Sequence, residues 1–85
     1  MNTNFYISSE YEKWIQAVTR YQLAEARLNQ RANAKTFQER IEAIDNLRSV
    51  ASGLLDGKES ARVHVDISRC GLTHLIYKRP QHANR

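Results

Sequence analysis

The sequence predicts an α+β fold of order β-α-α-β-β, in which a long antiparallel pair of helices packs on a small antiparallel sheet. Two observations lead to this prediction. Apolar residues repeat with the period of an α-helix between positions 9 and 56. Apolar and polar residues then alternate within positions 61–79, which is typical of half-buried strands. We therefore expect one domain whose working surface is a β-hairpin over 61–79.

The composition is that of a small folded domain with an excess of positive charge. The chain has 85 residues, of which 41% are hydrophobic and 26% charged, and its net charge is +4. This balance favours an anionic partner such as RNA, DNA or an acidic protein. The single cysteine excludes an internal disulfide and suits a reducing compartment. Neither a signal peptide nor a membrane span is evident, so we expect a cytoplasmic protein with no membrane partner.

The first two elements expected are a short strand or packed arm in residues 1–8 and a long helix. The helix begins with the pattern Ser9-x-x-Glu12, a capping box, and no Gly or Pro interrupts it up to about Asn33. Its apolar residues share one face at 100° per residue. They are Tyr11, Trp14, Ile15, Val18, Tyr21, Leu28 and Ala32.

A second capping box, Thr36-x-x-Glu39, predicts a second helix that runs to about Asp56 and stops at a left-handed Gly57. The short connection makes an antiparallel helical hairpin over 9–56. A turn centred at 34–35 places three apolar pairs side by side: Leu28 with Ile41, Val18 with Ala51, and Trp14 with Leu55.

A charged residue interrupts each apolar stripe of the hairpin. Glu25 lies in the first stripe and Arg48 in the second. Burying an unpaired carboxylate costs several kcal/mol. We therefore predict a structural Glu25–Arg48 pair with Tyr21 nearby.

After a polar linker at 57–60, the alternating segment predicts two strands joined by the turn Arg69-Cys70-Gly71, with Gly71 left-handed. One face of the hairpin is then apolar, with Val63, Val65, Ile67, Leu75 and Tyr77. The other face carries Arg62, His64, Asp66, His74 and Lys78. Residues 80–85 are expected to form a flexible, basic tail.

The polar face suggests either phosphate chemistry or phosphate binding. His64 and His74 could transfer protons in metal-independent RNA cleavage, because the pKa of histidine lies near neutrality. The cations proposed to bind are Lys58, Arg62, Arg69, Lys78 and Arg79. The spacing His-x5-Cys-x3-His matches no common zinc pattern, so we expect neither a metal nor another cofactor.

The chain resembles the RelE/ParE toxin superfamily, and in particular its YafQ-like branch. The resemblance rests on Tyr6–Trp14, on Leu55-Asp56-Gly57 followed by Arg62 and His64-Val65, and on the apolar segment ending Ile76-Tyr77-Lys78. It implies a ribosome-associated mRNA endoribonuclease that an antitoxin neutralises, with His64 at the catalytic histidine position and Arg62 contacting phosphate. The further strand or strands of that family have no counterpart after Arg79.

Three hypotheses for function follow, and whether the chain is an enzyme stays open. The first is a small binding module, of the regulator or inhibitor type that phages and mobile elements encode. It would dock its β-hairpin on a nucleic acid, a ribonucleoprotein or a protein. The second is the RelE-like endoribonuclease, and the third is a helical-hairpin homodimer with Gln22, Glu25 and Asn29 at the seam.

Overall fold

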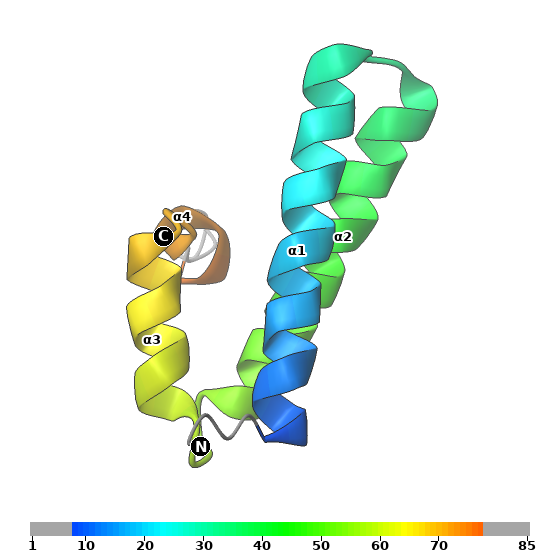
Figure 1. Cartoon of the computed structure of the whole chain (residues 1–85). Coiled ribbons are helices and arrows are strands. Elements are labelled where there is room, and N and C mark those ends of the chain that lie inside the picture. Colours follow the sequence, from blue (N-terminus) through cyan, green and yellow to red (C-terminus); the bar gives the residue numbers. More distant parts are fainter. Residues whose placement is uncertain (1–7, 78–85) are drawn as a thin grey trace, which may run out of the picture.

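The computed structural model describes residues 8–77, and every regular element within this range is a helix (Figure 1). The elements are α1 (Ser9–Gln30), α2 (Ala34–Leu54), α3 (Ser60–Arg69) and α4 (Thr73–Ile76). Because 8–77 contains no strand, the predicted α+β fold and its sheet are wrong, and the fold is a small helical one. The strand or arm predicted at 1–8, Ser8 excepted, lies outside the described residues, as do Lys78, Arg79 and the tail 80–85.

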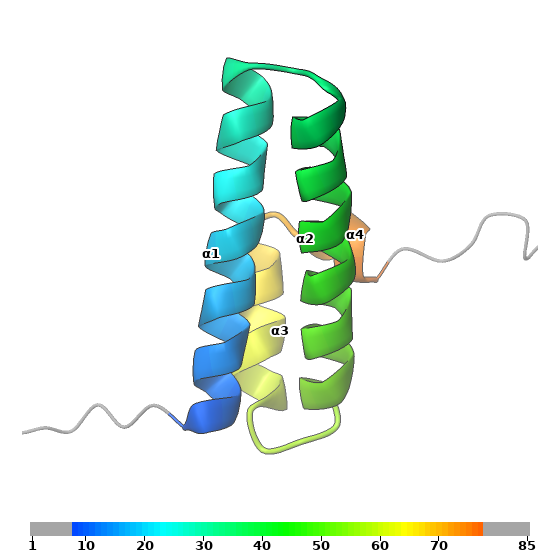
Figure 2. The same cartoon turned by 90° about the vertical axis from the view of Figure 1, so that its right-hand side faces the viewer.

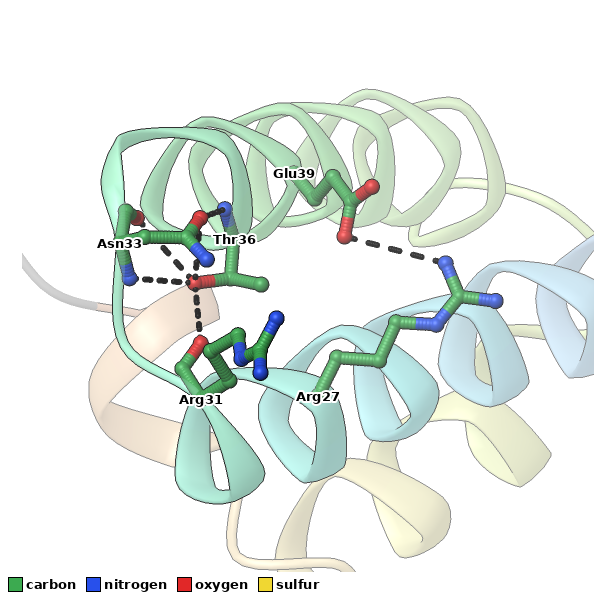
Figure 3. Close-up of polar contacts among 5 residues, drawn as sticks. All are labelled: Arg27, Arg31, Asn33, Thr36 and Glu39. Atoms are coloured by element: carbon green, nitrogen blue, oxygen red, sulfur yellow. Dashed lines mark hydrogen bonds and ion pairs between the residues drawn. The ribbon is translucent and has the colours of Figure 1, made fainter.

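Helices α1 and α2 fall within the predicted hairpin and run antiparallel (Figure 2). Their N-caps lie one to three residues earlier than the sequence pattern suggested. The Ser8 side chain accepts from the Tyr11 amide at 3.1 Å. Asn33 and Thr36 form a reciprocal capping box at the start of α2, with both backbone-to-side-chain distances 2.9 Å (Figure 3). The turn between the helices is therefore residues 31–33.

This earlier turn changes the register of the hairpin. Arg40 pairs with Glu25, and Arg27 pairs with Glu39. These pairs show that α2 is shifted along α1 by about one helical turn from the predicted register, in which Val18 would lie beside Ala51. Small side chains at the interface let the two helices approach closely: Ala17, Ala24, Ala43 and Ala51 are all buried.

The segment predicted as the first strand of the β-hairpin is helix α3. Val63 and Ile67 are fully buried, whereas Val65 is 53% exposed. A strand would have put all three side chains on one face, but a helix puts only positions i and i+4 together. The alternation over 61–67 was therefore too short to distinguish the two periods.

Gly71 does adopt the left-handed conformation, with φ +69°, but it ends a helix instead of turning a hairpin. The Leu72 amide donates to the Ile67 carbonyl at 2.8 Å and the Gly71 amide to the Ser68 carbonyl at 3.3 Å. These two bonds form a Schellman motif, completed by the burial of Leu72 and Ile67 in one cluster. The predicted left-handed Gly57 is not found, because Gly71 is the positive-φ residue of the described chain.

The core lies where α3 and α4 pack on one half of the hairpin. Its buried residues come from all four helices and the α3–α4 connection: Trp14, Ala17, Leu47, Ala51, Leu54, Val63, Ile67, Leu72 and Leu75. Both views show the hairpin continuing past α3 and α4 to the α1–α2 turn (Figures 1 and 2). A third helical layer therefore covers only part of the hairpin.

Candidate binding surface on the helical hairpin

The two histidines proposed for RNA cleavage lie on different helices. His64 lies on α3, where its ring stacks on Tyr77 with centroids 5.7 Å apart and its Nδ1 contacts the Tyr77 hydroxyl. His74 lies on the separate helix α4 and is exposed. The two-stranded face that would have held both histidines is replaced by two helices, because the chain between them is closed by the Schellman motif at Gly71.

Arg62 and Asp66 connect α3 to α1. Asp66 accepts hydrogen bonds from the Tyr11 hydroxyl and, at 3.2 Å, from the Trp14 Nε1. The bond to Asp66, followed by burial, raises the pKa of Tyr11. The Arg62 guanidinium lies 3.8 Å from the centroid of the Tyr11 ring and pairs with Glu59 at 3.4 Å. Both side chains are therefore engaged in packing α3 onto the hairpin.

Of the other predicted cations, the two within the described residues lie at opposite ends of α3. Lys58 lies in the α2–α3 connection and Arg69 in the last turn of α3, and both are exposed. Ten of the thirteen lysines and arginines and all nine acids fall within 8–77, which leaves a net charge of +1 there. The excess of positive charge is therefore concentrated in the sequence that follows Tyr77.

Glu25 has partners within the chain, and its arginine is Arg40 and not Arg48. The Arg40 Nε donates to Glu25 at 2.8 Å, and the Tyr21 hydroxyl donates to the same carboxylate at 2.6 Å. These bonds, that of Tyr21 first, lower the pKa of Glu25, whereas burial and the bond to Glu25 raise the pKa of Tyr21. Glu25 is thus a half-buried carboxylate whose charge is compensated.

Arg48 instead binds helix α4 to helix α2. Its Nε donates to the Leu75 carbonyl at 2.7 Å. Arg40 and Arg48 are eight residues apart on α2, so their side chains point about 80° apart around the helix. Arg40 therefore reaches α1 and Arg48 reaches α4, and the predicted Glu25–Arg48 pair is wrong.

The face of α2 that carries Arg48 extends past α4 towards the α1–α2 turn, and its apolar side chains are exposed there. Phe37, Ile41, Ile44 and Arg48 share one face of α2 by their spacing. Arg48 bonds α4 and Ile44 packs against the core, but Phe37 and Ile41 are each 51% exposed. The half-buried Leu28 lies at the corresponding end of α1. We call Leu28, Phe37 and Ile41 the open seam.

Phe37 was not assigned to the apolar stripe of the second helix, although it lies inside the predicted helix. Counted from the Asn33 cap, the positions Phe37, Arg40, Ile44, Leu47, Ala51 and Leu54 are spaced alternately by three and four residues. That spacing is typical of a continuous helical seam. It would have included both Phe37 and the arginine that pairs with Glu25.

Within residues 8–77 no three His, Cys, Asp or Glu side chains are grouped so that they could hold a metal ion. None of the four helices described is long and apolar enough to cross a membrane. No family model, curated protein or solved structure matches the chain. The resemblance to RelE/ParE toxins stays a prediction, and the α+β fold that it implied is not the fold observed.

Proposed function

We propose that this chain is a non-catalytic binding module that docks a protein partner through the open seam. The occupant we infer is an amphipathic helix with acidic residues on its polar face. The observation that carries the proposal is the half exposure of Phe37 and Ile41 on the same face of α2 as Ile44, which packs against the core, and Arg48, which bonds α4.

The shape of the seam suits a short helix. Residues 34–44 of α2 span about 16 Å at 1.5 Å per residue, which is three turns. In helix-in-groove recognition a docking helix anchors its own apolar side chains at i, i+3 or i+4 and i+7 on a surface of such a length. Docking there would extend the three-layer packing of the core to the α1–α2 turn.

The charges near the seam favour an acidic partner. Arg31 and Lys35 are exposed at the α1–α2 turn, and Arg48 is exposed beside α4. Asp45 is the acid one turn from Ile41 on α2. The net charge over 8–77 is only +1, below the strong excess of positive charge that is typical of a nucleic-acid-binding domain. A protein partner is therefore favoured over RNA.

Binding is also favoured over cleavage. A general base and a general acid must reach one scissile bond together. In the described residues His64 is stacked on Tyr77, and His74 lies on another helix. The hypothesis of an endoribonuclease gains no support from this arrangement.

The test uses fluorescence anisotropy with defined probes and the full chain. Two labelled helical peptides would have the same apolar face, one with an acidic and one with a basic polar face, and a labelled RNA oligonucleotide would be the third probe. We expect preference for the acidic peptide. Phe37→Ser/Ile41→Ser should lower its affinity by about 20- to 30-fold, because burying the exposed half of each side chain contributes about 1 kcal/mol.

Val65→Ser is the matched control, because Val65 is equally exposed but lies on α3. It should leave the affinity unchanged. The proposal is overturned if neither peptide binds, or if RNA binds and the double variant does not weaken it.

A further inference from the structure

We propose that a different face of the hairpin pairs two copies of this chain into a two-fold dimer. This face is a groove between α1 and α2, formed by these two helices alone. We call it the charged groove. Its charged side chains are Lys13, Arg20 and Arg27 on α1 and Glu39 and Glu42 on α2. The inference is independent of the open seam, which uses other residues of the same helices.

The groove is hollowed along its length. One hollow of about 430 Å³ is lined by residues that include Leu23, Arg27 and Glu42. A second of about 370 Å³ adjoins it at Gln16 and Arg20 and reaches Asn46 and Val50. Leu23 is 54% exposed and Ile15 38% exposed on the α1 side. The face therefore combines apolar surface with a concave shape that a facing helix can fill.

The charges of the groove are segregated by helix. Lys13, Arg20 and Arg27 are seven residues apart, so they form one line along α1. Glu39 and Glu42 are the facing acids on α2, and Arg27 is 3.7 Å from Glu39 (Figure 3). That pair leaves the Arg27 side chain 62% exposed, so it can also contact a neighbour. In the groove, one copy thus presents the basic side of α1 beside the acidic side of α2.

This segregation makes the face complementary to itself in one orientation. If the two-fold axis runs parallel to the helices, α1 of one copy lies over α2 of the other at the same height. Arg20 and Arg27 then face Glu42 and Glu39 of the second copy. An axis across the helices would instead place α1 on α1 and oppose like charges, which is destabilising. The charges therefore specify both the partner and the orientation.

The size of the face is sufficient for a dimer. Helices of 22 and 21 residues are about 30 Å long, and two side by side are about 20 Å wide. The projected area is on the order of 600 Å², and side-chain relief raises the accessible area towards the roughly 800 Å² per partner of a specific interface.

The test measures molar mass in solution by light scattering with the full chain, whose subunit mass is 9.9 kDa. We expect the wild type to have twice that mass at about 100 µM in low salt, and to dissociate as salt screens the charges. Arg20→Glu/Arg27→Glu and Glu39→Lys/Glu42→Lys should each be monomeric. Mixed in equal amounts, they should form a heterodimer, because opposite charges then face each other at both contacts.

Two controls separate this surface from others. Arg69→Glu reverses an exposed charge on α3 and should leave the dimer intact, and circular dichroism should show that every variant keeps its helix content. A monomeric wild type overturns the proposal, as does a dimer that both reversals leave unchanged. A dimer that Phe37→Ser/Ile41→Ser dissociates would place the interface at the open seam and would also overturn it.

Discussion

Asp66 is the residue whose removal should most weaken the attachment of α3 to the hairpin. Its carboxylate accepts from Tyr11 and Trp14, and the Trp14 residue is only 1% exposed. In Asp66→Ala the buried indole N–H would have no acceptor at this site. An unsatisfied buried donor costs about 1–3 kcal/mol, and a hydrogen bond to a charged group contributes about 1.5–3 kcal/mol.

Because Tyr11 is only half-buried, water can replace part of the hydrogen bond that its hydroxyl loses. We therefore use the low end of the range for the Tyr11 hydroxyl. The expected loss in the free energy of unfolding is therefore about 2–4 kcal/mol for Asp66→Ala. Asp66→Asn keeps a neutral acceptor and should lose about half as much. An exposed acid of α2 provides the control: Asp45→Ala should change stability by less than about 0.5 kcal/mol.

Urea unfolding followed by fluorescence tests this directly, since Trp14 is the only tryptophan of the chain. With a denaturant slope of about 1 kcal/mol/M for so small a domain, Asp66→Ala should lower the midpoint by about 2–4 M. The folded emission maximum should also shift, because the indole loses its partner. If Asp66→Ala unfolds at the same urea concentration as Asp45→Ala and keeps the wild-type emission maximum, the hydrogen bonds between α3 and α1 are not a major source of stability.

Three further predictions follow from the caps, the glycines and the buried carboxylate. Asn33→Ala removes the side-chain acceptor for the Thr36 amide and should cost about 1 kcal/mol in urea unfolding; an unchanged midpoint would contradict the cap. Gly71→Ala should destabilise the fold by about 1 kcal/mol, because φ of Gly71 is +69°. Gly53 lies in a helix with free space around its Cβ position, so Gly53→Ala should stabilise the fold by a similar amount. Equal effects of the two substitutions would refute the left-handed conformation of Gly71. The pKa of Glu25 is lowered by the Tyr21 hydrogen bond and by Arg40, so its contribution is complete above about pH 4.5 and is lost as pH falls through the folded value. Glu25→Gln should therefore flatten the acid limb of a plot of unfolding free energy against pH, and an unaltered limb would exclude this role.

The helical hairpin could be predicted from the sequence because its signal is long. Two stripes of about twenty residues fix the helical period, and the residues around Trp14 and Leu47 are buried as such stripes require. The register could not be predicted reliably, because it depends on which of several capping residues starts α2. Asn33 and Thr36 are both good caps, and choosing the later one moved every facing pair by about one turn.

Helix α3 could not be identified by periodicity over three apolar residues. Val63, Val65 and Ile67 fit a strand, and Val63 with Ile67 also fit a helix. The polar residues would have distinguished the two patterns. Glu59, Arg62 and Asp66 share the helical face of Val63, and in the structure this face contacts Ser8, Tyr11 and Trp14. A face that combines apolar and paired polar residues is invisible to a search for apolar side chains alone.

The open seam follows from a difference in length between the layers. Helix α1 has 22 residues and α3 only 10, so α3 spans about 15 Å of a hairpin that is about 30 Å long. The apolar face of α2 nevertheless continues through Ile41 to Phe37, beyond the part that α3 and α4 cover. A stripe meant for solvent would be polar there, since exposing two large apolar side chains contributes nothing to the stability of an isolated chain. This excess length of the apolar stripe is the reason for our proposal that another molecule covers the part that α3 and α4 leave exposed.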